Sequence, residues 1–240
     1  AMGQATGEVF FLLNSDAFLK DPGDLRRMLN LLAGEPGVGV LGPRLESEEG
    51  TLEYTARRFP SIREEVLRRF QLFRLLPRQV RRHLFLLEFF DHEEQIEADW
   101  VTGACMLVRR EAFEKAGGFD SDIFMYGEER EWCHRIRGQG FSVLFDPTVT
   151  VVHRRGGSSP HQEEWRIKMA LKADLQFIRS RLGRLRAWAF IGFRVLGLAL
   201  EGFLFRFTGV LGRSELLLRR ARRSGTERKL WVALIRKSRV

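Results

Sequence analysis

The stretch that decides the fold class is residues 9–16, VFFLLNSD. A continuous apolar run over 9–13, followed at once by polar Asn14, Ser15 and Asp16, is typical of a strand that is buried on both faces and ends in a turn. Such strands belong to α/β sheets, and open α/β sheets bind their ligands at the carboxyl ends of strands. We therefore expect an α/β fold with a binding site near Asp16.

Alternating strand and helix patterns follow this stretch. A helix is expected over 24–33 with Asp24 as its N-cap, and then a short buried strand over 37–42 that ends at Pro43. Further strands are expected over 100–108, 142–145 and 149–152, and helices over 61–90 (divided at Pro77), 109–116 and 128–137. The pattern predicts a mixed sheet flanked by helices.

Composition excludes several classes of protein. The chain has 240 residues, of which 44% are hydrophobic and 30% charged, so it can bury a substantial core and is neither disordered nor of low complexity. Its two cysteines, Cys105 and Cys133, are too few for a disulfide scaffold and have no Cys-x-x-Cys spacing for structural zinc. A reducing compartment fits best.

The net charge of +9 is unevenly distributed along the chain. Residues 1–159 contain 21 Lys and Arg against 25 Asp and Glu, whereas residues 160–240 contain 19 against 6. The basic excess therefore belongs to the C-terminal part, which invites a negatively charged partner such as an anionic membrane surface. We expect two parts, a catalytic domain over 1–160 and a basic helical appendage over 161–240.

The appendage has the pattern of a membrane-associating segment. One amphipathic helix is expected over 161–182. Residues 187–211 are largely apolar but are interrupted by charged residues, so a helix lying in the plane of the interface fits better than a span. Residues 213–240 mix Lys and Arg with Leu and Trp, which is typical of a segment lying on anionic lipid.

Three places along the chain could carry chemistry, and the first is Asp16. An aspartate exposed at a strand end can bind a hard divalent cation, which usually shares its coordination with substrate phosphates. An isolated Asn-x-Asp is more often a turn residue or a cap at the approach to a helix, so this residue alone decides little.

The second place is the cluster of Glu128, Glu129 and Glu131 at the start of a helix. The helix dipole favours acidic residues there. Three carboxylates within four positions nevertheless repel one another, and the preceding apolar Phe-Met-Tyr suggests a cleft wall in which one of them could act as a base. Both interpretations stay open.

The third place is His153, at the end of an apolar strand. A single histidine there can be an ordinary polar residue. However, Arg154, Arg155 and a Gly/Ser loop follow it, and two arginines with a flexible loop are suited to a bound pyrophosphate.

Together these stretches resemble the family 2 glycosyltransferases of the GT-A (Rossmann-like) fold, in particular their rhamnosyltransferase-like branch. The resemblance rests on residues 6–16 (TGEVFFLLNSD), 99–110 (DWVTGACMLVRR), 117–120 (GGFD), 124–133 (FMYGEEREWC) and His153 with Ser158 and Ser159. The order and spacing of these stretches carry it, since no single one would suffice.

The resemblance implies roles for particular residues. Asp16 and His153 would hold Mg²⁺ or Mn²⁺ on the donor diphosphate, and Glu129, the second residue of the Glu128–Glu129 pair, would be the catalytic base. The donor would be bound by Asn14, Arg154, Arg155, Ser158 and Ser159, and the acceptor cleft would be lined by Trp100, Thr102, Gly103, Asp120, Tyr126 and Glu131.

The implied reaction is inverting transfer of a sugar, with rhamnose as the expected one, from a nucleoside-diphosphate donor to a hydroxyl of a lipid-linked or cell-surface polysaccharide acceptor. The expected location is the cytoplasmic face of a bacterial membrane. Two departures stand out: position 129 is Glu where the family commonly has Asp, and the opening βαβ segment that holds the nucleotide is expected to be missing. The fold should then be truncated at its N-terminal side, with exposed sheet edges.

Two other classes of protein stay open. A catalytically silent module could bind glycan or assemble with another subunit, and a homo-oligomer is compatible with the sequence. A nucleic-acid binder is the weaker alternative, because the basic tail has no recognised motif and the body is net negative. We expect no nucleic-acid partner.

Overall fold

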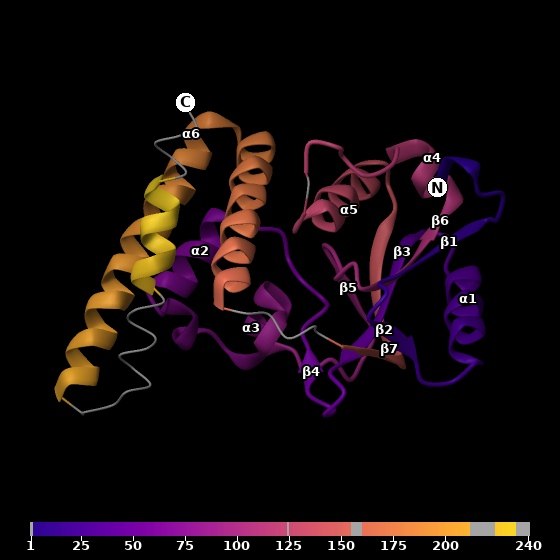
Figure 1. The fold of residues 1–240 in the computed structure, drawn as a ribbon, viewed down its shortest axis with the longest axis horizontal. Coiled ribbons are helices and arrows are strands. Elements are labelled where there is room, and N and C mark those ends of the chain that lie inside the picture. Colours follow the sequence, from indigo (N-terminus) through magenta and orange to yellow (C-terminus); the bar gives the residue numbers. More distant parts are fainter. Residues whose placement is uncertain (1, 124, 155–159, 212–223, 234–240) are drawn as a thin grey trace. The chain divides into compact units, whose positions relative to one another are not determined.

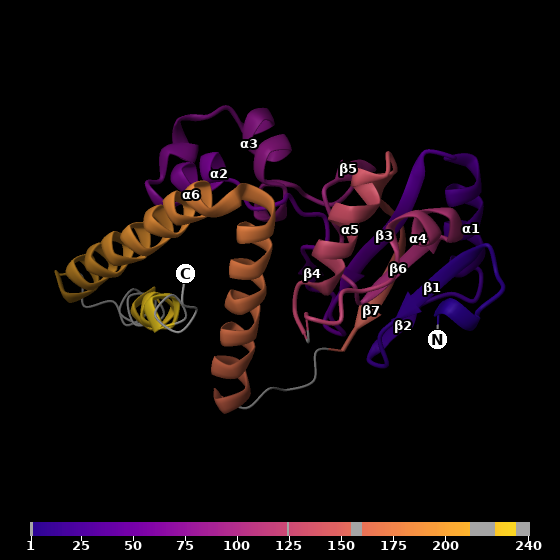
Figure 2. The same ribbon diagram turned by 90° about the horizontal axis from the view of Figure 1, so that it is seen from above.

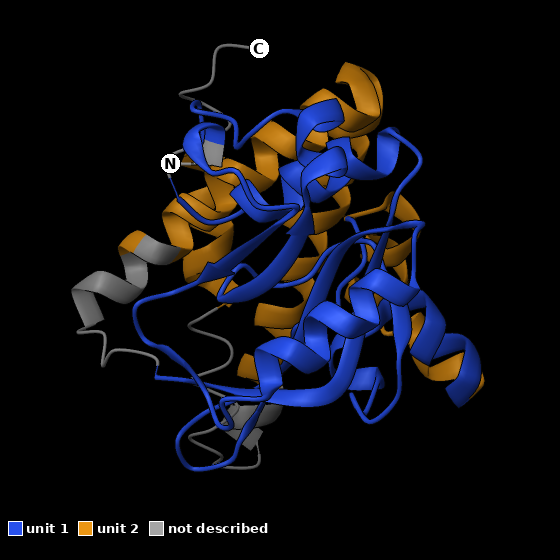
Figure 3. Ribbon diagram, turned by 90° about the vertical axis from the view of Figure 1, so that its right-hand side faces the viewer, with its two compact units in different colours: residues 1–59, 78–158 blue, residues 60–77, 159–240 orange. Residues whose placement is uncertain are grey.

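The computed structural model describes residues 2–123, 125–154, 160–211 and 224–233 (Figure 1). The chain forms two compact units, one of residues 1–59 with 78–158 and one of residues 60–77 with 159–240 (Figure 3). The chain passes from the first unit to the second after residue 158, and the sequence predicts a domain boundary at residue 160. Residues 60–77, however, group with the C-terminal part.

The first unit is built on a seven-stranded mixed sheet, in which five strands follow the order β1-β6-β3-β7-β2, with β1 and β2 at the two ends of this order. Strand β4 also pairs with β3, and β5 with β7. The strands are β1 (Val9–Leu13), β2 (Ala17–Leu19), β3 (Val38–Glu46), β4 (Leu52–Glu53), β5 (Ile96–Ala98), β6 (Cys105–Arg109) and β7 (Ser142–His153). Only the β3–β7 pair is parallel among the paired strands of the described residues.

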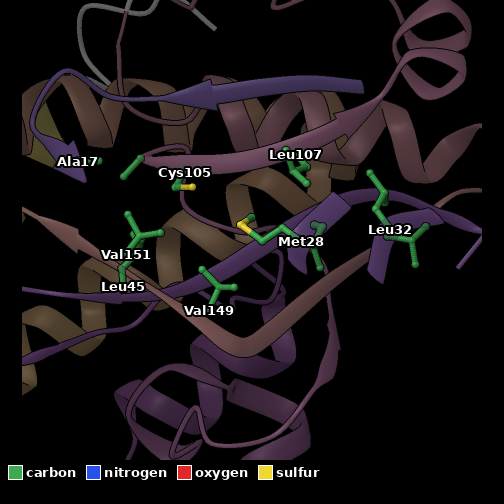
Figure 4. Packing of buried hydrophobic residues seen from close by; sticks show 11 residues of the cluster. Ala17, Met28, Leu32, Leu45, Cys105, Leu107, Val149 and Val151 are labelled. Carbon is green, nitrogen blue, oxygen red and sulfur yellow. The ribbon is translucent and has the colours of Figure 1, made fainter. Parts of the chain in front are cut away.

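Helices accompany this sheet, as the sequence predicted. They are α1 (Asp24–Gly34), α3 (Arg78–Phe85), α4 (Arg110–Ala116) and α5 (Glu128–Gly138), with short 3₁₀ turns η1 (Met2–Gln4) and η3 (Leu87–Phe89). Met28 and Leu32 lie one turn apart on α1, so both face the sheet and pack with Leu45, Leu107 and Val149 (Figure 4). This cluster forms the core beneath the strand ends that carry the site.

Helices α4 and α5 approach β3 closely at Gly39. A Cβ atom there would lie 2.7 Å from the Phe141 side chain and 2.9 Å from that of Ile136. Only a residue without a side chain permits this packing. Helix α4 ends at Ala116, and the next residue, Gly117, has a φ of 75°, a backbone conformation that residues with a side chain rarely adopt.

Two strand predictions are wrong in part, one in the burial of the strand and one in its first residue. Strand β1 is not buried on both faces: Phe10 is buried but Leu13 is exposed, because β1 lies at one end of the strand order. The strand predicted over 100–108 begins only at Cys105, since residues before it form β5 and a bend. In that bend Val101 packs against Gly42, where a Cβ atom would lie 2.7 Å from it.

A bulge explains two further corrections. Pro43 does not end its strand but lies inside β3, where the register with β7 shifts between Pro43 and Arg44. The two strands predicted on either side of Asp146-Pro147 are one strand, β7. The residues around the shift form a local irregularity in which the Asp146 carboxylate accepts a hydrogen bond from the Thr148 backbone at 2.9 Å, so neither proline breaks the sheet.

Asp24 is the first residue of α1 rather than its N-cap. Gly23 occupies the cap position without a side-chain hydrogen bond. The Asp24 carboxylate instead accepts from the backbone N–H of Asp21 at 3.0 Å and bonds the Arg27 side chain. It therefore fixes the turn before the helix.

The second unit is helical. It contains α2 (Ile62–Arg69), η2 (Leu72–Leu75), α6 (Pro160–Leu211) and a helical segment over 224–233. Helix α6 bends at Gly183, where φ is 72°, into two arms (Figure 2). Leu175 and Ile178 of the first arm pack with Phe190 of the second arm and with Trp231, so this part has a core of its own.

Charged side chains are buried inside this helical unit. Arg194 of the second arm bonds Glu65 of α2 at 3.0 Å and Asp174 of the first arm at 3.1 Å. Arg69 of α2 bonds Glu65 at 2.7 Å and Glu201 at 3.0 Å. The stretch Ile167–Phe207 is also long and apolar enough, by length and composition alone, to cross a membrane.

Candidate active site

Strand pairing brings Asp16 and His153 together. Asp16 directly precedes β2, whose first residue, Ala17, pairs with His153 at the end of β7. The Asp16 carbonyl accepts a hydrogen bond from the Arg154 backbone at 2.7 Å, which closes the pair. As a result His153 Nε2 lies 3.5 Å from Asp16 Oδ1.

A third side chain at this corner, Glu53 of β4, was not predicted from the sequence. Its carboxylate Oε2 lies 3.0 Å from His153 Nδ1, and its side chain is buried. A carboxylate on one ring nitrogen of a histidine fixes the ring and its tautomer, which leaves the other nitrogen available as a ligand. Glu53 is a lone acidic residue outside any motif, so only the pairing of β4 with β3, beside β7, reveals its partner.

The donor atoms of this corner fit a divalent cation whose coordination is completed by substrate. One carboxylate oxygen and one imidazole nitrogen point toward each other, a combination suited to Mn²⁺ and tolerated by Mg²⁺. Among the described residues no group of three His, Cys, Asp or Glu side chains could hold a metal ion by itself. Diphosphate oxygens and water could complete the coordination of a cation held by Asp16 and His153.

Glu129 lies in the first turn of α5, directly after a strained turn. Tyr126 has a φ of 65° and Gly127 a φ of 115°, both in the left-handed region. This conformation is costly for a residue with a side chain and is concentrated at functional sites. The turn sets where Glu128 and Glu129 enter the helix.

The surroundings of Glu129 favour its neutral form. Burial, and then the negative charge of Glu128, raise the pKa of the Glu129 carboxyl, and the charges of Arg130 and Arg57 offset this only in part. A carboxylate with a raised pKa is a better proton acceptor near neutral pH than an ordinary one. Glu128 Oε2 is itself buried without a hydrogen-bond partner among the described residues.

Gly103 and Trp100 border this carboxylate. A Cβ atom on Gly103 would lie 3.4 Å from Glu129 Cβ and 3.8 Å from its carboxyl carbon, so the glycine keeps one side of Glu129 open. Trp100 is nearly buried, with the guanidinium groups of Arg57 and Arg130 at 5.0 Å and 5.9 Å from its ring centre. Arg57, which sequence reasoning also missed, donates its backbone N–H to the Trp100 carbonyl at 3.0 Å.

The chain links the two halves of the site. Strand β1 pairs with β6 up to Leu13 and Cys105, and the next residue, Asn14, donates its backbone N–H to the Ala104 carbonyl at 2.9 Å. The turn that carries Asp16 therefore adjoins the bend of Thr102, Gly103 and Ala104, and that bend borders Glu129.

Other predicted site residues have local roles. Glu131 bonds Arg135 at 2.7 Å, and Arg135 also donates to the Gly118 carbonyl at 2.6 Å, so Glu131 helps to fix the loop before α5. The Asp120 carboxylate accepts from the Asp122 backbone at 2.9 Å within that loop.

The predicted diphosphate-binding residues are only partly within the described chain. Arg154 is exposed, pairs with Glu48 and lies over the Phe18 ring at 4.6 Å. Its backbone is bonded to Asp16, and its guanidinium is accessible to an anion. Arg155, Ser158 and Ser159 lie outside the described residues.

Comparison with known proteins identifies rhamnosyltransferase relatives. The chain is 28% identical over 160 residues to an N-acetylglucosaminyl-diphospho-decaprenol L-rhamnosyltransferase of Mycobacterium tuberculosis, an alignment that covers 67% of this chain and 52% of that protein. It is 29% identical over 172 residues to an O-antigen biosynthesis protein of Myxococcus xanthus, covering 69% of this chain and 13% of that protein. The chain thus spans about half the length of the first of these relatives. No protein-family model matches it.

Comparison with solved structures supports the fold. The chain resembles a mannosyltransferase of Pyrobaculum calidifontis, solved in complex with GDP-Man and Mn²⁺, with a TM-score of 0.51 and 16% identity. The match covers 98% of this chain and 63% of that one. The GT-A fold predicted from the sequence is confirmed.

Proposed function

Because the chain is a relative of the rhamnosyltransferase-like glycosyltransferases of the GT-A fold, we propose that it transfers a sugar from a nucleoside-diphosphate donor to an acceptor hydroxyl. The observation that carries this proposal is the shared corner of the sheet. There the Asp16–His153 pair, suited to a metal-bound diphosphate, adjoins the bend that borders a half-buried carboxylate of raised pKa, Glu129.

Glu129 acts as the general base. Its carboxylate takes the proton of the acceptor hydroxyl while that oxygen bonds to the anomeric carbon of the donor sugar. The bond from this carbon to the diphosphate oxygen breaks in the same step, so the nucleoside diphosphate leaves and the configuration inverts. Gly103 leaves room for the acceptor beside the carboxylate.

The opposite side of the site receives the leaving group. Asp16 and His153 would hold Mg²⁺ or Mn²⁺ there, and the bound cation would offset negative charge on the departing diphosphate. The Arg154 guanidinium is positioned to add a second positive charge, by exchanging its exposed partner Glu48 for a phosphate oxygen.

The substrates are proposed from the relatives. A relative named as a rhamnosyltransferase acting on a diphospho-decaprenol supports rhamnose as the sugar and a lipid-linked acceptor. A second relative named for O-antigen biosynthesis supports a cell-surface polysaccharide as the product. A lipid-linked acceptor would place the enzyme at the cytoplasmic face of the bacterial membrane.

A donor screen tests the proposal. The full chain is incubated with a panel of nucleoside-diphosphate sugars and Mn²⁺ or Mg²⁺, with and without a polyprenyl-diphosphate-linked acceptor, and release of nucleoside diphosphate is measured. Acceptor-dependent release with one donor is expected. Glycan binding without release from any donor would instead favour the silent-module alternative.

A further inference from the structure

The second arm of α6 exposes large apolar side chains, whereas an ordinary surface helix turns its apolar face toward the core. Five large apolar side chains lie exposed on one face at spacings of three and four residues, and we call them the outer stripe: Phe193, Leu196, Leu200, Phe203 and Phe207. Phe203 is 67% exposed and Phe207 is 56% exposed. Residues at this spacing share one face of a helix.

Two charged residues in the middle of the same arm, Arg194 and Glu201, face the other way. Arg194 and Glu201 lie about 120–140° around the helix from the outer stripe, at 100° per residue. Arg194 bonds Glu65 and Asp174, and Glu201 bonds Arg69, all within the helical unit. The two charged residues in the middle of this arm therefore find their partners inside the helical unit, and the apolar face is presented outward.

A helix with an exposed apolar face is stabilised when that face contacts an apolar environment. Exposed apolar residues scattered singly are ordinary, but a continuous stripe of them marks an interaction surface. At 1.5 Å per residue the stripe from Phe193 to Phe207 runs for about 21 Å. This length suits a helix lying along a surface.

Charge decides which surface fits. Arg186 and Arg206 are exposed near the two ends of the outer stripe, and residues 160–240 carry 19 Lys and Arg against 6 Asp and Glu. A second copy of the chain would bring two such basic regions together and repel, whereas anionic lipid headgroups would attract them. The expected occupant is thus a lipid surface.

We propose that the second arm of α6 lies in the plane of an anionic membrane, with the outer stripe at the boundary between headgroups and acyl chains. The proposal builds on the lipid-linked acceptor of the proposed function and names the surface that would keep the enzyme beside it. A spanning helix is disfavoured because the inward face of this arm carries ion-paired charges and α6 bends at Gly183, inside the apolar stretch.

The test uses a fluorescent label at single introduced cysteines in the full chain. Cys105 and Cys133 are buried, so an introduced exposed cysteine can be labelled selectively. F203C carries an environment-sensitive dye on the outer stripe. L75C, at a position 81% exposed outside α6 in the same unit, is the matched control. Vesicles containing phosphatidylglycerol should shift the emission of the dye at 203 to shorter wavelength and leave the dye at 75 unchanged.

A second measurement tests the energetics. Leu200→Ser combined with Phe203→Ser should weaken partitioning into these vesicles by at least ~10-fold, while Leu75→Ser has no effect. High salt or neutral vesicles should weaken binding of the wild type, because the basic residues contribute to it. Unchanged circular dichroism and thermal melting of the double variant establish that it is folded.

Three results would overturn the proposal. These are no vesicle response at position 203, an equal response at 75, or light scattering that shows a dimer dependent on the outer stripe without vesicle binding. The assays separate this proposal from the proposed function, since a chain that binds vesicles but transfers no sugar contradicts only the latter. A chain that transfers sugar without binding vesicles contradicts only the membrane surface.

Discussion

Glu53 Oε2 lies 3.0 Å from His153 Nδ1, on the side of the imidazole ring opposite to Asp16. Four strands meet here, because β4 pairs with the end of β3, β3 runs beside β7, and β7 pairs with β2. The His153 ring thus lies between the buried carboxylate of Glu53 and the half-exposed carboxylate of Asp16. Glu53 is suited to positioning the ring, and Asp16 to binding a metal ion together with Nε2.

We predict that Glu53→Ala weakens Mn²⁺ binding by roughly 10–100-fold in the presence of a nucleoside diphosphate, because the His153 ring loses its fixed orientation. Glu53→Gln, which can still hydrogen-bond the ring, should retain more of the affinity. Electron paramagnetic resonance of free Mn²⁺ measures binding without requiring turnover. The control is Glu49→Ala, an exposed glutamate near the same strand. Equal Mn²⁺ affinity of wild type and Glu53→Ala would remove Glu53 from this role.

The raised pKa of Glu129 predicts how activity depends on pH. A base must be ionised, so kcat/KM should fall as pH falls through the pKa of this carboxyl, which lies above the ordinary glutamate value of 4.5. Glu128→Gln removes one cause of the elevation. The half-point of the acidic limb should then move to lower pH. A half-point that stays in place in Glu128→Gln would show that another group controls the profile.

Gly103 predicts a graded steric effect. Gly103→Ala places its methyl group in ordinary contact with Glu129, whereas the branched side chain of Gly103→Val extends further and occupies the space that an acceptor needs. We expect Gly103→Val to raise the acceptor KM and lower kcat by ~10²-fold, with a smaller loss in Gly103→Ala. Steady-state kinetics measures both, with thermal melting as the folding check. Equal kinetics in both folded variants would place the acceptor elsewhere.

The buried Arg194 predicts a large stability effect. Arg194→Ala leaves the Glu65 and Asp174 carboxylates without this partner and should cost about 3–5 kcal/mol of unfolding free energy. Chemical denaturation followed by circular dichroism measures the change. Arg184→Ala, at an exposed position, should stay within about 0.5 kcal/mol of wild type. A small effect at Arg194 would mean that water reaches the network.

Local patterns predicted much of the fold. The strand before Asp16, the glycine stop after α4 and the helix predicted over 161–182 are encoded by residues near one another in sequence, and the structure contains all three, although β1 is not buried on both faces. The predicted strand ends are wrong where pairing between strands far apart in sequence overrides the local effect of a proline. Pro43 and Pro147 predict strand breaks, but a register shift between β3 and β7 accommodates both prolines.

The residues of the candidate site also fall into those that local motifs reveal and those that only distant pairing reveals. Asp16, Glu129 and His153 could be selected from motif order, whereas Glu53 and Arg57 could not, because their partners come from β7 and from the Trp100 bend far along the chain. The same reason hid the grouping of residues 60–77 with the C-terminal part. Glu65 of α2 becomes meaningful only beside Arg194.

The most direct test of the central claim compares sugar transfer by wild type, Asp16→Ala and Glu129→Gln with the donor identified by the screen. We predict that Glu129→Gln lowers kcat by ~10²–10⁴-fold while Mn²⁺ and donor still bind, and that Asp16→Ala loses Mn²⁺-dependent donor binding. Transfer that is unaffected by both substitutions would contradict the assignment of this corner of the sheet as a glycosyltransferase site.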